Sequence, residues 1–391
     1  MDERTRAYLR GRFRDFYRRQ EIEPPPAAER REWGYIPFSP GGTTMIRHRS
    51  LFDLGDLGDF LRRERPRHVY FSAGRYRDPG AGTMGEKGWQ GSDLIFDLDA
   101  DHLPGVDPDA DTYGEMLASC KEALYRLLDI LTDDLGFADP AIVFSGGRGY
   151  HVHVRDPSVR DLGRESRREV VDYIRGIDVE FEALVETEAV AGMGLKNPTQ
   201  KRTLSTTGGW GRRAHRRLVA LVEELMDGPD EQAIERLESY EGIGPGKAAS
   251  ALTAAGSNLD EIRKGNIDVH PAFYSLARAV FEETLETESA AIDEPVTTDI
   301  HRLIRLPGTL HGGTALRVMP LTREGLEDFD PLVDAVPKVF TGHEISVRVA
   351  EESPVELGGE TFTVPAGVTT LPEYVALFLM ARGRAEKEKE A

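Results

Sequence analysis

The sequence predicts a mixed α/β protein (α+β) in which a helical segment interrupts a core of mixed sheets and helices. Three observations lead to this class. Apolar runs of strand length surround short polar turns within residues 68–154. Residues 163–290 carry an almost wholly helical pattern instead. Strand-like segments resume only at Val296, so the helical block is expected to be an insertion between two halves of one core.

This pattern divides the chain of 391 residues into three segments. Residues 1–162 are expected to form the first half of the core, and residues 163–290 the helical insertion. Residues 291–391 complete the core and end in a charged tail, Lys387–Ala391, that we expect to be frayed. A chain of this length allows about two or three compact units.

The first half begins with a helix rich in arginine and aromatic residues, which ends at Pro24-Pro25-Pro26. A strand is predicted at His68–Phe71, and a glycine-rich loop from Ala73 to Gly91 leads to the next strand. An acidic loop over residues 103–114 and a helix over residues 115–131 follow.

Two further strand-like runs, at residues 141–144 and 150–154, surround a glycine-rich turn and therefore predict a hairpin. Beyond them the apolar spacing becomes helical. The helices predicted within the insertion cover residues 166–186, 214–226, 230–240 and 270–286.

The net charge of −19 at first argues against a nucleic-acid partner, because acids outnumber bases 68 to 49. Lysine is scarce, however, and arginine supplies most of the positive charge. An acid-rich, lysine-poor chain is typical of a halophilic protein, in which hydrated carboxylates maintain solubility. In that case local basic clusters indicate function better than the total does. The alternative is a protein that binds no anionic partner.

The sequence contains no apolar run of about 18 residues that could span a membrane. The charged N-terminus does not resemble a secretory signal. The single cysteine, Cys120, can form neither an internal disulfide nor a thiolate zinc site and is expected to be a core thiol. We therefore expect a cytoplasmic protein without membrane association.

The strand after the glycine-rich loop carries two carboxylates on one face. Leu94, Phe96 and Leu98 form its apolar face. Because side chains alternate across a strand, Asp97 and Asp99 project together from the other face, about 7 Å apart. Carboxylates held so close repel each other, so such a fold usually offers a cation, most often Mg²⁺ or Mn²⁺. The alternative is a half-buried strand with a solvated acidic face.

The turn of the predicted hairpin has the composition of an anion-binding loop. Glycines let backbone N–H groups approach an anion closely, and arginine and histidine add charge-assisted donors. The alternative is a tight hairpin whose glycines only satisfy turn geometry. The turn and the start of its second strand read Ser145-Gly146-Gly147-Arg148-Gly149-Tyr150-His151.

A third segment, Thr297–Gly312, places another carboxylate, Asp299, close to two arginines and two histidines. Asp299 alone would more often be a helix cap or turn residue. Three carboxylates together with cationic phosphate donors describe two-metal phosphoryl or nucleotidyl transfer. In that chemistry the ions clamp the attacking oxygen and the triphosphate.

These segments together resemble the catalytic small subunit of the archaeal/eukaryotic type of DNA primase. The order of the motifs agrees with that family, as does the lead-in Lys87–Asp93, and the resemblance covers roughly residues 33–320. The matching motifs are Phe96-Asp97-Leu98-Asp99-Ala100-Asp101-His102, Phe144-Ser145-Gly146-Gly147-Arg148-Gly149-Tyr150-His151 and Asp299-Ile300-His301-Arg302-Leu303-Ile304-Arg305-Leu306-Pro307-Gly308-Thr309-Leu310-His311-Gly312.

The resemblance implies a mixed-sheet primase core with a helical insertion, and synthesis of short primers from nucleoside triphosphates on single-stranded DNA. It also implies a heterodimer with a large primase subunit. Asp97, Asp99 and Asp299 would hold two Mg²⁺ or Mn²⁺ ions. The residues implied to meet the incoming triphosphate are Ser145, Gly146, Arg148, Gly149 and His151, with Arg305 and His311 near its phosphates.

The chain departs from the family pattern in two places. Relatives carry a cysteine/histidine zinc knuckle after the D-x-D strand, whereas the segment Pro104–Tyr113 contains no cysteine, so no structural zinc is expected. Many relatives also carry a lysine where this chain has Gly313. Arg305 and Arg317 are close enough in sequence to supply that contact.

Two weaker signals lie in the helical block. The segment Gly242–Gly246 resembles the glycine turn of a helix-hairpin-helix, which presents N–H groups to a DNA phosphate, or is a plain helix–helix turn. The basic cluster Arg212–Arg217 could follow template phosphates. Alternatively, it is a solvated helix start paired with Glu223 and Glu224.

Two other functions are compatible with parts of the pattern. A phosphatase of the haloacid-dehalogenase type also uses a strand-borne D-x-D, but usually near the chain start and with Thr or Val where this chain has Asp101. A non-catalytic nucleic-acid-binding subunit would leave the turn Ser145–Gly149 and His151 without a role.

Overall fold

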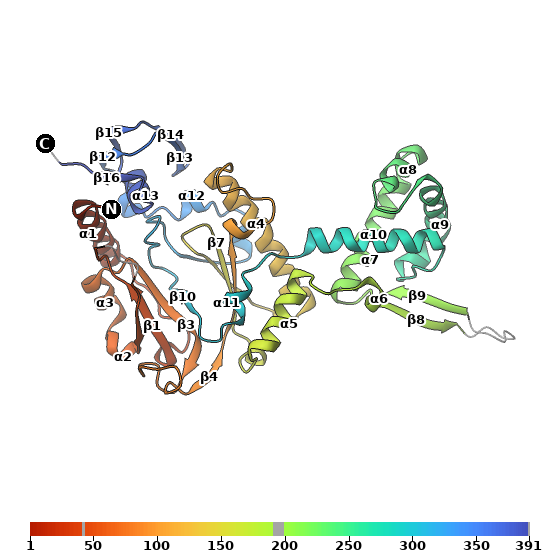
Figure 1. The fold of residues 1–391 in the computed structure, drawn as a ribbon, viewed down its shortest axis with the longest axis horizontal. Coiled ribbons are helices and arrows are strands. Elements are labelled where there is room, and N and C mark those ends of the chain that lie inside the picture. The colour runs from red at the N-terminus through yellow and green to blue at the C-terminus, as the bar shows by residue number, and fades with distance from the viewer. Residues whose placement is uncertain (41–43, 191–198, 390–391) are drawn as a thin grey trace. The chain divides into compact units, whose positions relative to one another are not determined.

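The computed structural model describes residues 1–40, 44–190 and 199–389 and shows a mixed helix-and-sheet fold (Figure 1). This confirms the predicted α+β class. The chain divides into two compact units. The core unit comprises Met1–Tyr125, Phe137–Val171 and Ala291–Ala391, and the helical unit comprises Arg126–Gly136 and Asp172–Ala290. Within the described residues no helix is long and apolar enough to cross a membrane.

Eight helices begin in the described part of the core unit. They are α1 (Glu3–Arg19), α2 (Leu51–Leu54), α3 (Leu57–Glu64), α4 (Tyr113–Asp129), α5 (Arg164–Arg175), α11 (Glu294–Thr298), α12 (Pro331–Asp334) and α13 (Glu373–Ala381). The predicted arginine- and aromatic-rich helix is α1, which buries Leu9, Phe13 and Phe16.

The strands of the core unit form antiparallel sheets. They are β1 (Arg31–Ile36), β2 (Ile46–Arg49), β3 (His68–Tyr76), β4 (Trp89–Ser92), β5 (Leu94–Asp99), β6 (Ala141–Phe144), β7 (Gly149–Val154), β10 (Leu303–Arg305), β11 (Met319–Leu321), β12 (Glu344–Val349), β13 (Ser353–Leu357), β14 (Glu360–Val364), β15 (Gly367–Pro372) and β16 (Ala385–Lys387). One sheet has the order β10-β3-β1-β2, with β4 also paired to β3, and a second has the order β11-β6-β7-β5. Two smaller sheets, β15-β12-β16 and β13-β14, lie in the C-terminal segment.

The second sheet carries the D-x-D strand and the glycine-rich hairpin side by side. In the pairing of β5 with β7, Asp97 lies opposite His151 and Asp99 lies opposite Gly149. Opposite residues of an antiparallel pair share one face of the sheet. The predicted hairpin is formed by β6 and β7. Asp97 and Asp99 therefore project from one face of β5, as the alternation of side chains predicted. They lie beside the start of β7.

Helix α4 contributes the apolar layer under this sheet. The predicted helix over residues 115–131 is α4, continued by the π-helical segment Ile130–Asp134. Cys120 is fully buried on it and donates to the carbonyl oxygen of Leu98 at 3.5 Å. The cysteine is thus a core thiol, as its place on the apolar stripe indicated.

The helical unit contains the predicted helices and, in addition, a hairpin. Its helices are α6 (Phe181–Leu184), α7 (Gly209–Met226), α8 (Asp230–Glu238), α9 (Pro245–Arg263) and α10 (Pro271–Glu288), and its strands are β8 (Val185–Val190) and β9 (Thr199–Leu204). The single helix predicted over residues 166–186 is wrong. Helix α5 ends at Arg175, because Gly176 adopts a left-handed φ of 66°.

Two other expectations about the C-terminal half need correction. The segment at Val296 is helix α11, in which Pro295 occupies the first turn, and the first strand there is β10. The tail is not frayed from Lys387 onward, because Lys387 is buried in β16 and pairs with Val347 of β12. Apolar composition alone did not separate a short helix from a strand in the first case.

Candidate active site

The acidic pair and the glycine-rich turn open on one cavity of about 570 Å³ in the core unit. The cavity is formed where β5 ends, β7 begins and the chain passes through β10 and the loop after it. Its walls include Asp97, Leu98, Asp99, Tyr113, Ser145, Gly147, Arg148, Gly149, His151, Arg305, His311, Gly313, Thr314, Ala381, Arg382 and Arg384. Eight of the ten residues singled out from sequence as metal or phosphate ligands therefore meet here, and Gly146 and Asp299 are the two that do not line the cavity.

Asp97 and Asp99 point into this cavity from the end of β5. Their side chains are 22% and 35% exposed, so both reach solvent while their strand neighbours are buried. Burial, together with the charge of Asp99, raises the pKa of Asp97 to about 6. Carboxylate oxygens crowded in this way are the ligands that Mg²⁺ and Mn²⁺ prefer. A divalent cation would relieve the repulsion between them.

His151 lies opposite Asp97 on the neighbouring strand β7, on the same face of the sheet, with its Nε2 3.5 Å from Oδ1 of Asp97. Burial, together with the nearby charges of Arg305 and Arg302, lowers the pKa of His151 to about 3. The imidazole is therefore neutral at pH 7. It can donate one hydrogen bond to a phosphate oxygen, but it does not bring the positive charge expected from the sequence.

The turn Ser145–Gly149 is held in shape by its own backbone and by the loop after β10. The Ser145 N–H donates to the carbonyl oxygen of Gly149 at 2.9 Å, and the Gly147 N–H donates to Ser145 Oγ at 3.2 Å. Gly146 has a φ of +73°, and a Cβ there would meet His311 Cβ at 2.7 Å. A Cβ at Gly149 would clash with the backbone of Leu98. Gly146 is therefore required by its left-handed φ and by the nearby His311 side chain, and Gly149 by the close approach of the Leu98 backbone.

Arg148 lies at the tip of the turn beside the acidic strand. Its Nη2 is 2.5 Å from Asp101 Oδ2, and its Nε is 3.7 Å from Asp99 Oδ1. The side chain is 43% exposed, so a phosphate can still reach it. Asp101, to which the sequence assigned no ligand role, therefore acts as the counter-ion that orients Arg148.

Arg305 enters the cavity from β10. Its Nε donates to the carbonyl oxygen of Ser145 at 3.3 Å, and its Nη1 donates to Tyr70 Oη at 3.4 Å. The guanidinium also lies over the Tyr70 ring at 5.3 Å from the centroid. Burial lowers the pKa of Arg305, yet the group stays charged. Arg305 thus supplies a fixed positive charge beside the turn.

His311 closes the cavity on the same side. Its Nδ1 is 3.1 Å from Thr314 Oγ1, and its ring packs edge-on against His68 at 5.0 Å between centroids. Burial keeps the pKa of His311 well below the ordinary value, and Arg305 adds to this effect. Like His151, it is a neutral hydrogen-bonding group at pH 7.

Asp299 lies on a different element from these residues, at the end of α11. It caps the C-terminal end of α11, is exposed, and accepts a hydrogen bond from the His301 N–H at 2.9 Å. It does not line the cavity. Among residues 1–40, 44–190 and 199–389, no three Asp, Glu, His or Cys side chains gather in a way that could hold a metal ion. The role of Asp299 as a third carboxylate stays a prediction.

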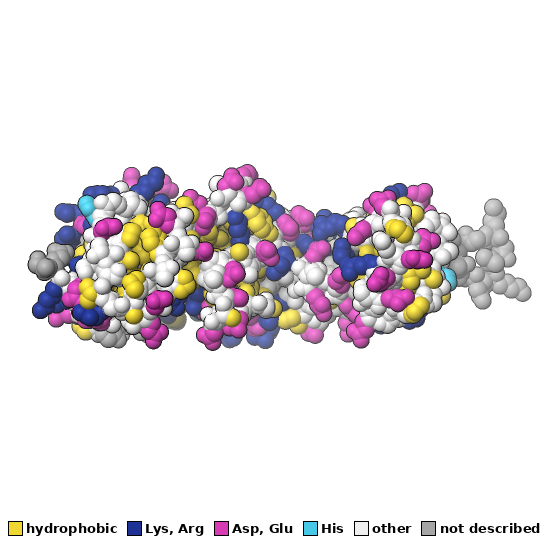
Figure 2. All heavy atoms as spheres, turned by 90° about the horizontal axis from the view of Figure 1, so that it is seen from above, with side chains coloured by type: hydrophobic (Ala, Val, Ile, Leu, Met, Phe, Trp, Pro, Cys, Tyr) yellow, Lys and Arg dark blue, Asp and Glu magenta, His cyan; other side chains and the backbone are white. Residues whose placement is uncertain are grey.

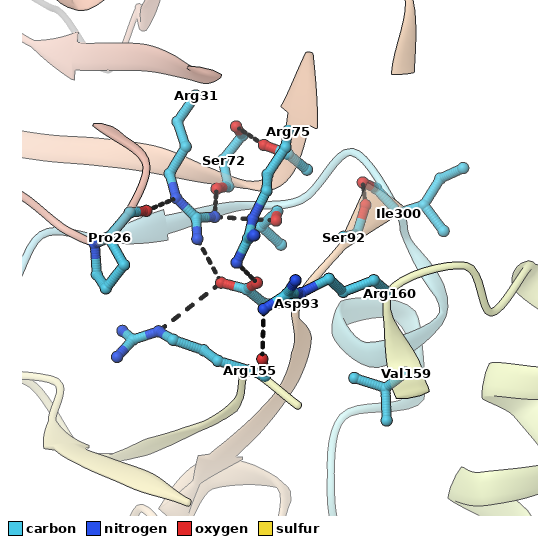
Figure 3. Close-up of polar contacts among 12 residues, drawn as sticks. Pro26, Arg31, Ser72, Arg75, Ser92, Asp93, Arg155, Val159, Arg160 and Ile300 are labelled. Atoms are coloured by element: carbon cyan, nitrogen blue, oxygen red, sulfur yellow. Dashed lines mark hydrogen bonds and ion pairs between the residues drawn. The ribbon is translucent and has the colours of Figure 1, made fainter. Parts of the chain in front are cut away.

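The start of β5 is anchored by a buried ionic network (Figure 3). Asp93, fully buried, is 2.5 Å from Nη2 of the equally buried Arg31 and 2.9 Å from Nη2 of Arg75. Nε of Arg155 lies 3.8 Å from the same carboxylate. Arg167 donates to the carbonyl oxygen of Asp93 at 3.0 Å. The strand that carries Asp97 is therefore fixed at the residue just before it, by side chains from β1, β3 and α5 and by Arg155, which follows β7.

The weaker sequence signals lie in the helical unit and have different surroundings from those expected. Arg212 and Arg213 pair with Asp134, at 3.1 and 2.6 Å, and Arg216 pairs with Glu288 at 3.2 Å. Glu223, which one of the two alternatives paired with this cluster together with Glu224, instead pairs with Arg263. The segment Gly242–Gly246 contains Gly242 at a φ of 75° and Pro245 as the first residue of α9.

The cavity residues that sequence reasoning did not find include Tyr113, Arg382 and Arg384. Tyr113 begins α4, and its hydroxyl donates to the carbonyl oxygen of Gly147 at 2.6 Å. Arg382 and Arg384 follow α13 and lie 70 and 72 residues in sequence after Gly312, where the third motif ends. No local pattern marks them, since their position depends on the tertiary fold.

Comparisons with known proteins give one consistent result. A family model described as DNA primase small subunit matches residues 96–323. The DNA primase small subunit of Haloarcula marismortui is 61% identical to this chain, and that of Natronomonas pharaonis is 58% identical, each match covering 100% of both chains. The DNA primase small subunit of Methanocella arvoryzae is 44% identical over 99% of this chain and 100% of its own length.

Proposed function

Because the chain belongs to the DNA primase small-subunit family, in which it is the catalytic primase subunit, we propose that the cavity synthesises primers by two-metal nucleotidyl transfer. The substrates would be nucleoside triphosphates, and the template would be single-stranded DNA. One observation carries the proposal. Asp97 and Asp99 share a single cavity with the turn Ser145–Gly149 and with Arg305, so metal ligands and phosphate donors lie within reach of one triphosphate.

The protein groups divide the work by their chemistry. Mg²⁺ or Mn²⁺ ions held by Asp97, Asp99 and Asp299 would supply Lewis-acid stabilisation of charge on the reacting oxygens. Arg148 and Arg305 place two fixed positive charges beside the phosphates. The backbone N–H groups of the glycine turn approach the phosphates closely, because no Cβ intervenes.

His151 has a narrower role in this proposal. Its imidazole is neutral at pH 7, so it orients a phosphate by donating one hydrogen bond rather than by its charge. His311 and Thr314 support the turn from behind, since Thr314 Oγ1 donates to the carbonyl oxygen of Gly146. Together these contacts hold the triphosphate in one orientation toward the acidic pair.

We also propose that the chain works as a heterodimer with a large primase subunit, since the relatives are named as small subunits. A phosphatase of the haloacid-dehalogenase type and a non-catalytic binding subunit are both disfavoured by the family. The turn beside the acidic pair also argues against a subunit without catalytic function.

A structural zinc is not part of the proposal. The acidic loop between β5 and α4 offers Asp107, Asp109 and Asp111, of which the first two are exposed, and no cysteine. Four cysteine or histidine ligands are normally needed for a stable structural site. Elemental analysis of the chelator-washed protein tests this point, and one tightly bound zinc per chain would contradict it.

The central experiment measures incorporation of labelled nucleotide on a poly-pyrimidine template, with the chain assembled with its large subunit. Asp99→Asn removes one carboxylate charge and should lower incorporation by about 10²-fold or more, because charge stabilisation in the transition state is lost. Template binding and thermal unfolding should stay unchanged.

The matched control is Asp109→Asn, an equally small change in the exposed acidic loop, which should leave incorporation at the wild-type rate. Incorporation by Asp99→Asn at close to the wild-type rate would remove the basis for the two-metal assignment.

A further inference from the structure

The segment that follows α13 contributes two arginines to the catalytic cavity. Arg382 and Arg384 line it together with Asp99 and Arg148, although both lie outside residues 96–323, which the family model matches. We propose that Arg382 and Arg384 bind phosphate groups of the substrate in this cavity. The inference rests on the proposed function and adds a second set of phosphate ligands to it.

The Arg382 guanidinium lies over two aromatic rings. Its Cζ is 4.7 Å from the centroid of Tyr113 and 5.2 Å from that of Phe378. Cation–π contacts of this kind help to position the guanidinium and use none of its N–H donors. Within the described residues no carboxylate or carbonyl oxygen accepts a hydrogen bond from them. Arg382 is thus a half-buried cation, oriented in advance, whose donors are available to an anion.

Tyr113 connects this cation to the predicted triphosphate site. Its ring supports Arg382, and its hydroxyl donates to the carbonyl oxygen of Gly147, in the middle of the glycine turn. A phosphate bound at the turn therefore lies next to a residue that packs on Arg382. Because Tyr113 contacts both Arg382 and Gly147, it holds the arginine side chain close to the turn.

Arg384 has a fixed backbone and an exposed side chain. Its N–H donates to the carbonyl oxygen of Leu379 at 2.9 Å, and its carbonyl oxygen accepts from the Ala350 N–H at 3.1 Å. No ion pair holds its guanidinium within the described chain. The backbone contacts thus place the side chain at the cavity wall and leave its charge available.

The other two arginines of the cavity are already engaged. Arg148 pairs with Asp101 at 2.5 Å, and Arg305 donates to Ser145 and Tyr70. Arg382 and Arg384 are therefore the cavity arginines whose guanidinium groups make no hydrogen bond or ion pair within the described residues. On a chain with a net charge of −19, such a local excess of positive charge is where a polyanion can approach without strong repulsion.

Two parts of the substrate carry a phosphate that fits these arginines, the incoming nucleotide and the template–primer strand. A neighbouring cavity of about 330 Å³ shares Tyr113, Arg382 and Arg384 with the catalytic cavity. The two arginines thus border both spaces. They can reach the triphosphate of the incoming nucleotide or a backbone phosphate of the template–primer strand, and the same chemistry serves both.

The test uses the double variant Arg382→Ala/Arg384→Ala and the single variant Arg384→Ala in the heterodimer. Arg384 is exposed, so its removal cannot disturb packing. Arg348→Ala is the matched control, an exposed arginine of β12 that does not line the cavity. Thermal unfolding checks that each variant is folded.

Two measurements separate the sources of the phosphate. One is the KM for nucleoside triphosphate at saturating template. The other is the affinity for fluorescein-labelled oligo-dT as a function of salt. If the triphosphate is the ligand, the double variant should raise KM about tenfold at unchanged template affinity. If the strand is the ligand, it should weaken oligo-dT binding and lower the slope of log K against log salt by about 1 to 2.

Wild-type KM, wild-type affinity and an unchanged salt slope in the folded double variant would overturn the inference. That result differs from a failure of the proposed function, in which the wild-type protein itself incorporates no nucleotide.

Discussion

His153 shows how burial controls the charge of side chains close to the catalytic sheet. It is fully buried on β7, and its ring stacks on Phe71 at 6.1 Å and 12°. Neither ring nitrogen has a hydrogen-bond partner within the described residues. Burial therefore holds the pKa of His153 well below the ordinary value, and the nearby Arg155 lowers it further. The native protein keeps this imidazole neutral.

The stability of the protein should therefore fall on acidification. Below about pH 6.5 the unfolded chain takes up a proton at His153 that the native state does not, so the unfolded state is favoured. His153→Phe removes the group that takes up this proton and keeps an aromatic ring in its place. At pH 7 the variant should unfold at the same temperature as the wild-type protein or at a higher one. For each pH unit below 6.5, its free energy of unfolding should fall by up to about 1.4 kcal/mol less than that of the wild-type protein.

Thermal unfolding of both proteins between pH 7.5 and pH 5 checks this expectation, with the exposed His102→Gln as the control. The same loss of stability on acidification in wild type and His153→Phe would show that burial of His153 has no part in it.

Single residues also show how far sequence reasoning could reach. The alternation of side chains along a strand was enough to put Asp97 and Asp99 on one face, because it depends only on local geometry. The pairing of Arg148 with Asp101 could not be predicted, since it depends on the register of β5 with β7. Arg382 was missed because its place in the cavity also depends on the tertiary fold, which brings together residues far apart in sequence.

Among the elements, β5 matters most, and its position depends on the network around Asp93. The carboxylate is buried with Arg31 and contacts Arg75, while Arg167 binds backbone oxygens of Ser92 and Asp93. Each arginine comes from a different element, so the network ties the start of β5 to the adjoining sheet (Figure 3). Buried charges of this kind cost much to desolvate and are stable only when paired.

Asp93→Asn should therefore be strongly destabilising. It leaves Arg31 buried without its counter-charge, and removal of one partner from a buried pair costs about 3 to 5 kcal/mol. Denaturant unfolding measures this change. Asp78→Asn in the same region of sequence serves as a comparison, because Asp78 is exposed. Unfolding of Asp93→Asn at the wild-type denaturant concentration would show that the network does not hold β5.

Elements of strong periodicity were easier to predict than short ones. The helices α7, α8 and α10 match their predicted segments because their apolar spacing continues over several turns. Helix α11 was mistaken for a strand because five residues, Glu294–Thr298, are too few to show a period. The β8–β9 hairpin was missed, since alternation and helical spacing cannot be distinguished in such short polar runs.

For the whole molecule the dominant property is its negative charge. Figure 2 shows acidic side chains distributed over the face in view, with lysine and arginine side chains between them. With a net charge of −19 the folded chain repels itself at low ionic strength. Relatives from halophilic archaea share more than half of its residues. Total charge was therefore a poor guide to function, and the arginines of one cavity were a better one.

The charge predicts that stability rises with salt. The Debye length falls from about 10 Å at 0.1 M to about 3 Å at 1 M salt, so repulsion between surface carboxylates is screened. The unfolding temperature should increase steadily as KCl is raised over this range. A temperature that is constant or falls with KCl would contradict the view that repulsion limits stability. Choline chloride at the same ionic strength tests whether screening alone suffices.

The central claim is that Asp97 and Asp99 hold the catalytic metal ions, and Mn²⁺ binding measured by electron paramagnetic resonance tests it most directly. The titration is carried out in the presence of a non-hydrolysable nucleoside triphosphate. Each chain should take up two Mn²⁺ ions, and the folded variant Asp97→Asn/Asp99→Asn should lose this binding, while Asp109→Asn should retain it. Mn²⁺ binding by the double variant with wild-type affinity and stoichiometry would contradict the account.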